Sequence, residues 1–157
     1  MSHTGRVGES EGHASILIVR AAGRACALPL ELVIETMRPL PITLMAGAPP
    51  AVLGVAMIRG VPTVVVALAK LVSDTAPPAG RFVTVRVGAR VVALAVDAVI
   101  GIRSLPRAQL HPLPPLLGSV DSIAAIAALD AELVFALRGS QLVPDDVVAL
   151  LAQEAMS

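Results

Sequence analysis

The hydrophobic residues of the chain fall into short runs of valine, isoleucine, leucine and alanine, separated by turns that contain glycine. Two such runs flank Gly23, two flank Gly88, and two flank the dipeptide Arg59-Gly60. β-Branched runs on both sides of a glycine-bearing turn are typical of β-hairpins. A fourth hairpin is predicted over residues 123–137. The pattern therefore predicts a mainly β protein.

The chain also repeats itself. Residues 16–33 and residues 82–99 share one order of strand, glycine turn and strand, followed by an acidic residue and a valine. Arg20 in the first copy matches Arg86 in the second. A proline-rich connection and a further hairpin follow each copy, so the whole arrangement is doubled.

The doubling divides the chain into two halves, about 16–72 and about 81–140, with a linker at about 73–80. A half of ~55 residues buries little apolar surface by itself. We therefore expect two small β-barrel units that pack together on a shared apolar core.

Signals for helix and for disorder are confined to short segments. Pro144 and the two aspartates after it suit the first turn of a helix, which predicts a C-terminal helix at about 144–156. A second short helix is predicted over residues 68–72. Residues 1–13 are polar and rich in glycine and serine, which predicts a disordered tail.

Composition excludes several classes of protein. The 157 residues are 55% hydrophobic with a net charge of zero. That is far too apolar for a disordered chain, and it lacks the basic surplus that nucleic-acid binding needs. The uncharged run 39–58 approaches the length of a membrane helix, but it contains four prolines, so we expect no membrane insertion.

No constellation of residues indicates catalysis, a metal site or a cofactor site. His3, His13 and His111 do not have the spacing of three or four converging ligands. Cys26 lies inside an apolar strand, which predicts a buried and unreactive thiol. Phosphate-binding loops and strained serine turns are also missing from the sequence. We expect no enzyme and no small-molecule substrate, although convergent polar groups around a cavity would favour a ligand-binding or hydrolytic β domain.

Three segments, 27–35, 48–60 and 92–99, carry a resemblance to a known family in their order and spacing. The chain resembles the CheW-like domain family, with a single domain over residues 14–157. The resemblance implies a fold of two five-stranded SH3-like barrels around a common core, with short helices. It also implies a cytoplasmic, non-enzymatic scaffold that couples chemoreceptors to a CheA-type histidine kinase, at a membrane-associated receptor array.

The resemblance further assigns residues to two partner surfaces. The groove that would face the cytoplasmic tip of the chemoreceptor contains Val33, Glu35 and Arg59. The surface near the regulatory domain of the histidine kinase contains Gly54, Gly60 and Val61.

The spacing of the residues alone makes Arg59 a solvated turn residue, and Gly60 the residue that supplies a positive φ. The resemblance implies instead that Arg59 pairs with Glu35 across the groove. Loss of one partner of a shielded pair would strand the other charge, whereas an exposed pair contributes little to stability.

The chain departs from the family pattern at several positions, and three of the departures bear on function. Met57, Ala67 and Ala125 stand where the family commonly has asparagine, aspartate and glycine. These changes support an alternative interpretation, in which the chain is a divergent accessory or regulatory module. Such a module would have lost one partner surface and would serve another motility or sensory pathway.

Overall fold

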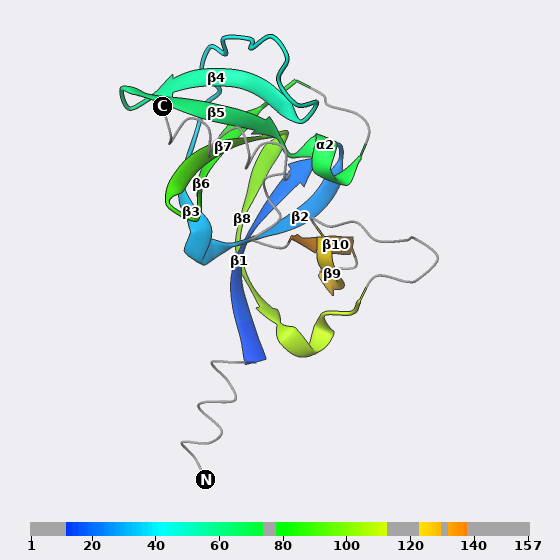
Figure 1. Cartoon of the computed structure of the whole chain (residues 1–157). Coiled ribbons are helices and arrows are strands. Elements are labelled where there is room, and N and C mark those ends of the chain that lie inside the picture. Colours follow the sequence, from blue (N-terminus) through cyan, green and yellow to red (C-terminus); the bar gives the residue numbers. More distant parts are fainter. Residues whose placement is uncertain (1–11, 74–77, 113–122, 130–131, 138–157) are drawn as a thin grey trace.

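The computed structural model describes residues 12–73, 78–112, 123–129 and 132–137, and most of them form β-strands (Figure 1). The strands are β1 (His13–Ala21), β2 (Arg24–Pro29), β3 (Val33–Met37), β4 (Val52–Ile58), β5 (Val61–Ala67), β6 (Arg81–Val87), β7 (Arg90–Val96), β8 (Ala98–Pro106), β9 (Ile123–Leu129) and β10 (Glu132–Leu137). Three short helical segments accompany them: η1 (Leu30–Leu32), α2 (Ala69–Val72) and η2 (Arg107–Gln109). The predicted mainly β class is confirmed.

Two-residue turns with positive φ close two of the hairpins. Ala22 and Gly23 have φ of 53° and 75° between β1 and β2, and Arg59 and Gly60 have φ of 52° and 76° between β4 and β5. Turns with two positive φ angles match the right-handed twist of the flanking strands. Glycine adopts a positive φ readily, and so Gly23 and Gly60 correctly indicated the positions of these two hairpins in the sequence.

The strands form two five-stranded sheets, with the orders β8-β1-β2-β10-β9 and β3-β6-β7-β5-β4. The two orders are the same when each strand is replaced by its copy in the repeat. Each sheet contains one parallel pair, β2 with β10 and β5 with β7, whereas its other pairs are antiparallel. The two predicted SH3-like barrels correspond to these two sheets.

The sheets do not follow the two halves of the sequence. The hairpin β1–β2 from the first half joins β8, β9 and β10 from the second, and the hairpin β6–β7 joins β3, β4 and β5. The expectation that residues 16–72 and 81–140 each form their own barrel is therefore wrong. The physical reason is the short segment η1 after β2, which carries the chain from one sheet directly into the other.

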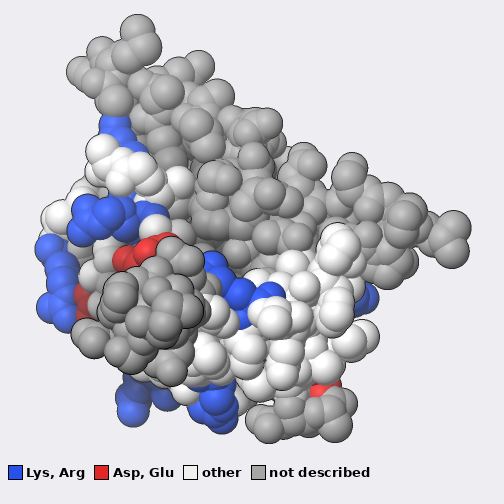
Figure 2. Space-filling view, turned by 90° about the horizontal axis from the view of Figure 1, so that it is seen from below, with Lys and Arg blue, Asp and Glu red and all other residues white. Residues whose placement is uncertain are grey.

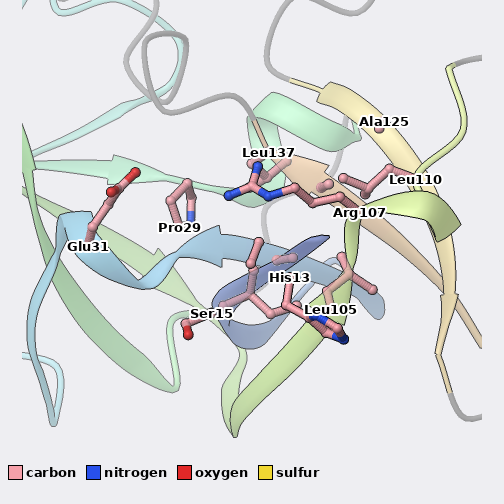
Figure 3. A pocket seen from close by; sticks show the side chains of 13 residues that line it. His13, Ser15, Pro29, Glu31, Leu105, Arg107, Leu110, Ala125 and Leu137 are labelled. Carbon is pink, nitrogen blue, oxygen red and sulfur yellow. The ribbon is translucent and has the colours of Figure 1, made fainter. Parts of the chain in front are cut away.

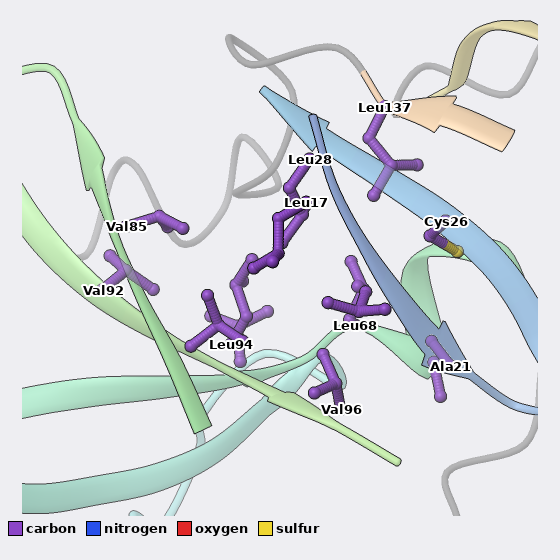
Figure 4. Close-up of a cluster of buried hydrophobic side chains, with 14 of the residues drawn as sticks. Leu17, Ala21, Cys26, Leu28, Leu68, Val85, Val92, Leu94, Val96 and Leu137 are labelled. Atoms are coloured by element: carbon purple, nitrogen blue, oxygen red, sulfur yellow. The ribbon is translucent and has the colours of Figure 1, made fainter. Parts of the chain in front are cut away.

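The largest core cluster lies between the two sheets (Figure 4). Leu17 and Leu28 enter it from β1 and β2, whereas Val85 and Leu94 enter it from β6 and β7. Burial of one such side chain contributes about 1.5–3 kcal/mol. Two smaller clusters fill the individual barrels, one around Leu105 and one around Phe82. The shared apolar core is thus built by strands from both halves.

Several predicted segments lie at or beyond the edges of the described residues. His13 opens β1 and pairs with Pro106, so the predicted tail 1–13 extends one residue too far. Residues 1–11, part of the predicted linker, and the predicted helix 144–156 lie outside the described residues. The predicted helix at 68–72 is confirmed as α2. Among the described residues, no helix has the length and apolar character needed to cross a membrane.

Candidate functional site

The centre of the candidate site is an ion pair between Glu35 and Arg59. The Nε atom of Arg59 donates to Oε2 of Glu35 at 2.7 Å, and one Nη atom donates to Oε1 at 2.7 Å. Two parallel hydrogen bonds of this kind fix the geometry as well as the charge of the pair. The pairing that the family resemblance implied is therefore present.

The fold explains why these two residues meet. Glu35 lies on β3 and Arg59 lies in the turn after β4, and β3 and β4 are the two edge strands of one sheet. Their contact shows that the sheet curls until its edges approach each other. The chain after β3 helps to close this gap, because Thr43 and Val55 of β4 exchange two backbone hydrogen bonds.

The pair is exposed on the Arg59 side. The side chain of Arg59 is 75% exposed, whereas that of Glu35 is 26% exposed. Hydrogen bonding from Arg59 lowers the pKa of Glu35, and the same bonds raise the pKa of Arg59. Because exposed ion pairs contribute little to folding, this pair is better suited to presenting a fixed charge pattern than to holding the sheet together.

Val33 lies on the same strand as Glu35 but points only partly to solvent. It pairs with Val85 and packs against the central core. A register shift between Val33 and Glu35 leaves Ile34 as an extra residue, and its side chain is 44% exposed. Sequence reasoning missed Ile34, because a β-bulge cannot be recognised from the alternation of residues.

The three residues assigned to the kinase-facing surface differ in accessibility. Gly54 is buried, and its backbone lies against the oxygen of Thr43. Gly60 is exposed in the turn, and Val61 is 59% exposed at the start of β5. Gly60 and Val61 therefore lie on a surface, whereas Gly54 shapes the backbone beneath it.

Met57, which is 59% exposed, faces Pro62 across the β4–β5 hairpin, and its side chain lies on the opposite face of the hairpin from Val61. Val61 and Val91 are exposed apolar side chains on the neighbouring strands β5 and β7, at 59% and 41%. A pocket of about 200 Å³ lies here, and Val61, Val91 and Arg90 contribute to its wall. Val91 and Arg90 were not predicted as site residues, since only the pairing of β5 with β7 places them here.

A second bidentate ion pair lies in the other sheet. Arg20 on β1 donates to both carboxylate oxygens of Glu132 on β10, at 2.6 and 2.8 Å. These hydrogen bonds lower the pKa of Glu132. One signal for this pair is present in the sequence, because Glu132 begins β10 whereas Val61 begins the equivalent strand β5.

A larger pocket of about 420 Å³ opens between the ends of β1, β8 and β10 (Figure 3). The carboxylate of Glu31 and the guanidinium of Arg107 do not meet in it, since Figure 3 shows them apart, with Pro29 between them. No group of His, Cys, Asp or Glu suited to a metal ion occurs among the described residues. The pocket gives no support to a ligand-binding or hydrolytic function.

Neither Cys26 nor the surface charges form a reactive site. Cys26 is buried, as predicted, and burial raises its pKa to about 12. Lysine and arginine side chains form several separate groups on the face shown in Figure 2. Neither feature adds a reactive group to the candidate site.

Comparison with known proteins agrees with this architecture. A family model, the CheW-like domain, matches residues 15–147. Among solved structures, the fold is similar to that of the scaffolding protein TtCheW from Thermoanaerobacter tengcongensis, with a TM-score of 0.71 and 21% sequence identity. That match covers 80% of this chain and 88% of the other. A search among curated proteins finds no match. Since the family model spans most of the sequence, the chain belongs to the CheW-like domain family.

Proposed function

We propose that the protein is a non-enzymatic cytoplasmic scaffold in chemotaxis signal transduction. It couples the cytoplasmic tip of a chemoreceptor to the regulatory domain of a CheA-type histidine kinase, at a membrane-associated receptor array. The observation that carries the proposal is the bidentate pair of Glu35 and Arg59 on an exposed edge of the fold. Membership of the CheW-like family supports it.

The receptor surface is proposed around this pair. Arg59 uses its Nε atom and one Nη atom on Glu35, so its other Nη group retains donors for a partner. Ile34 adds an exposed apolar side chain on the same strand, and Val33 lies partly exposed beside it. An apolar contact next to a fixed hydrogen-bond donor suits a helical receptor tip with a polar side chain beside apolar ones.

The kinase surface is proposed on the β4–β5 hairpin. Gly60 permits the tight turn, and the exposed side chain of Val61 lines a pocket together with that of Val91 on the neighbouring strand β7. Exposed apolar side chains gathered in this way commonly mark a protein-binding surface. Gly54 lies buried in β4 of the same hairpin, so its proposed role is to shape the backbone that presents Gly60 and Val61.

The two surfaces can be tested separately with purified proteins. Titration with a receptor cytoplasmic fragment and with the kinase regulatory domain should show binding of each, and together they should form a ternary complex. Glu35→Ala and Arg59→Ala should each weaken receptor binding about tenfold and leave kinase binding unchanged. Glu132→Ala is the matched control, because it breaks an equivalent ion pair in the other sheet.

The same titrations separate the scaffold from a module that has lost one surface. Met57 motivates this second candidate, since it places an exposed apolar side chain in a hairpin where the family commonly has asparagine. Binding of only one partner would support the accessory or regulatory module. A ternary complex would exclude it, and unchanged receptor binding by both Glu35→Ala and Arg59→Ala would contradict the assigned receptor surface.

A further inference from the structure

The repeat allows each position in one sheet to be compared with its copy in the other. Arg20 faces Ala25 in the hairpin β1–β2, just as Arg86 faces Val91 in the hairpin β6–β7. The neighbouring hairpins correspond in the same way. Glu132 faces Leu129 between β10 and β9, and Val61 faces Ile58 between β5 and β4. Val61 therefore occupies in one sheet the position that Glu132 occupies in the other.

The chemistry at these equivalent positions is different. In the first sheet, Glu132 neutralises Arg20 through two hydrogen bonds. In the second sheet, valine replaces the glutamate, and the side chain of Arg86 makes no hydrogen bond or ion pair within the part of the chain that the structure describes. Arg86 is exposed at the end of β6. The second sheet thus retains the arginine of the pair and lacks the carboxylate.

Apolar side chains lie beside this unneutralised arginine. Val91 is directly opposite Arg86 across the β6–β7 ladder and is 41% exposed. Val61 is 59% exposed, and both valines line the pocket of about 200 Å³ between β5 and β7. An arginine bordered by exposed apolar side chains forms a stronger ion pair when a partner excludes water from it.

We propose that this end of the sheet binds a carboxylate side chain of the kinase regulatory domain, held by Arg86 and flanked by apolar side chains that cover Val61 and Val91. The incoming carboxylate takes the place that Glu132 has in the other sheet. The inference rests on the proposed function, and it adds the chemical group that the kinase must supply.

The first test uses charge reversal at two ends of one strand. Arg86→Glu should weaken binding of the purified kinase regulatory domain by about tenfold or more, because it opposes the incoming carboxylate. Arg81→Glu is the matched control, since Arg81 is also exposed on β6 but faces Val96 at the far end of the hairpin. It should change the Kd by less than about twofold.

The outcomes separate this inference from the proposed function. If the unmodified protein does not bind the kinase domain, the proposed function fails, and this inference fails with it. If the unmodified protein binds and Arg86→Glu binds equally well, the inference alone is overturned. Equal weakening by Arg86→Glu and Arg81→Glu would also overturn it, because the effect would then come from net charge and not from a specific contact.

A second test examines the geometry without the kinase. Val61→Glu places a carboxylate at the position equivalent to Glu132, and the exposed side chain of Val61 makes this change compatible with folding. An NMR titration should show a lowered pKa for the introduced carboxyl when Arg86 is present, and a higher value when Arg86→Gln is added. The same pKa with and without Arg86 would overturn the inference.

Discussion

The backbone oxygen of Thr43 occupies the space that a side chain on Gly54 would need. Gly54 also has a φ of 145°, a conformation that residues with a side chain rarely adopt. Both features arise where the chain after β3 crosses β4 and bonds with Val55. The backbone of the segment between β3 and β4 therefore requires glycine at position 54.

Gly54→Ala should destabilise the fold by about 2–5 kcal/mol, since it combines an unfavourable φ with a clash against backbone. Gly88→Ala is the matched control, because Gly88 also has a positive φ but has open space around it. That control should cost only about 1–2 kcal/mol. Urea unfolding of both variants measures the difference, and equal losses would show that the contact with Thr43 is unimportant.

Arg59→Ala should raise the pKa of Glu35 toward its ordinary value of about 4.3, because the hydrogen bonds that lower it are lost. A carboxyl whose pKa is lower in the folded state stabilises the fold above its unfolded pKa, and this contribution disappears as the pH falls through the folded value. Carboxyl NMR titration measures the shift. Glu132 is an internal control, because its lowered pKa depends on Arg20 and should not move.

Glu132→Ala should accelerate hydrogen exchange in β9 and β10 by about two- to fivefold, because it removes the side-chain link between β10 and β1. The backbone attachment of β10 to β2 is short, since only Val134, Phe135 and Ala136 pair with that strand. Amide exchange followed by NMR measures the effect. Glu35→Ala breaks the other bidentate pair and should leave exchange in β10 unchanged; if both variants behave alike, the link is not specific.

Cys26 should resist thiol-labelling reagents at pH 8 in the folded protein and react rapidly in urea. Burial raises its pKa to about 12, so the reactive thiolate forms in the unfolded chain at a lower pH than in the folded one. A raised pKa means that its contribution to stability is complete below the unfolded pKa, near 8.5, and is lost as the pH rises toward 12. Labelling of the folded protein at the rate seen in urea would contradict the burial of this thiol.

The sequence predicted local structure better than the pairing between distant strands. The turns at Gly23 and Gly60 fixed their hairpins, because positive φ and β-branched flanks are local properties. The exchange of hairpins between the sheets could not be predicted, since both copies carry the same apolar pattern and either could pair with either set of strands. The Arg20–Glu132 pair depends on that exchange, and so it was also missed.

Only part of the candidate site could be predicted, again because much of it depends on contacts between segments that are distant in sequence. Family resemblance brought Glu35 and Arg59 together, although they are separated in sequence and no local pattern joins them. The burial of Gly54 and the exposure of Ile34 depend on a chain crossing and on a bulge, and neither feature has a signature in residue spacing.

The exchange of hairpins has a consequence for the order in which a nascent chain can fold. All strands of the sheet β3-β6-β7-β5-β4 have been synthesised once Val96 has left the ribosome, but the hairpin β1–β2 must wait for β8, β9 and β10. The first strands to be made are therefore among the last to find their neighbours. Contacts between such distant segments slow folding. The hairpin β1–β2 can therefore pair wrongly until Leu137, the last residue of β10, has left the ribosome.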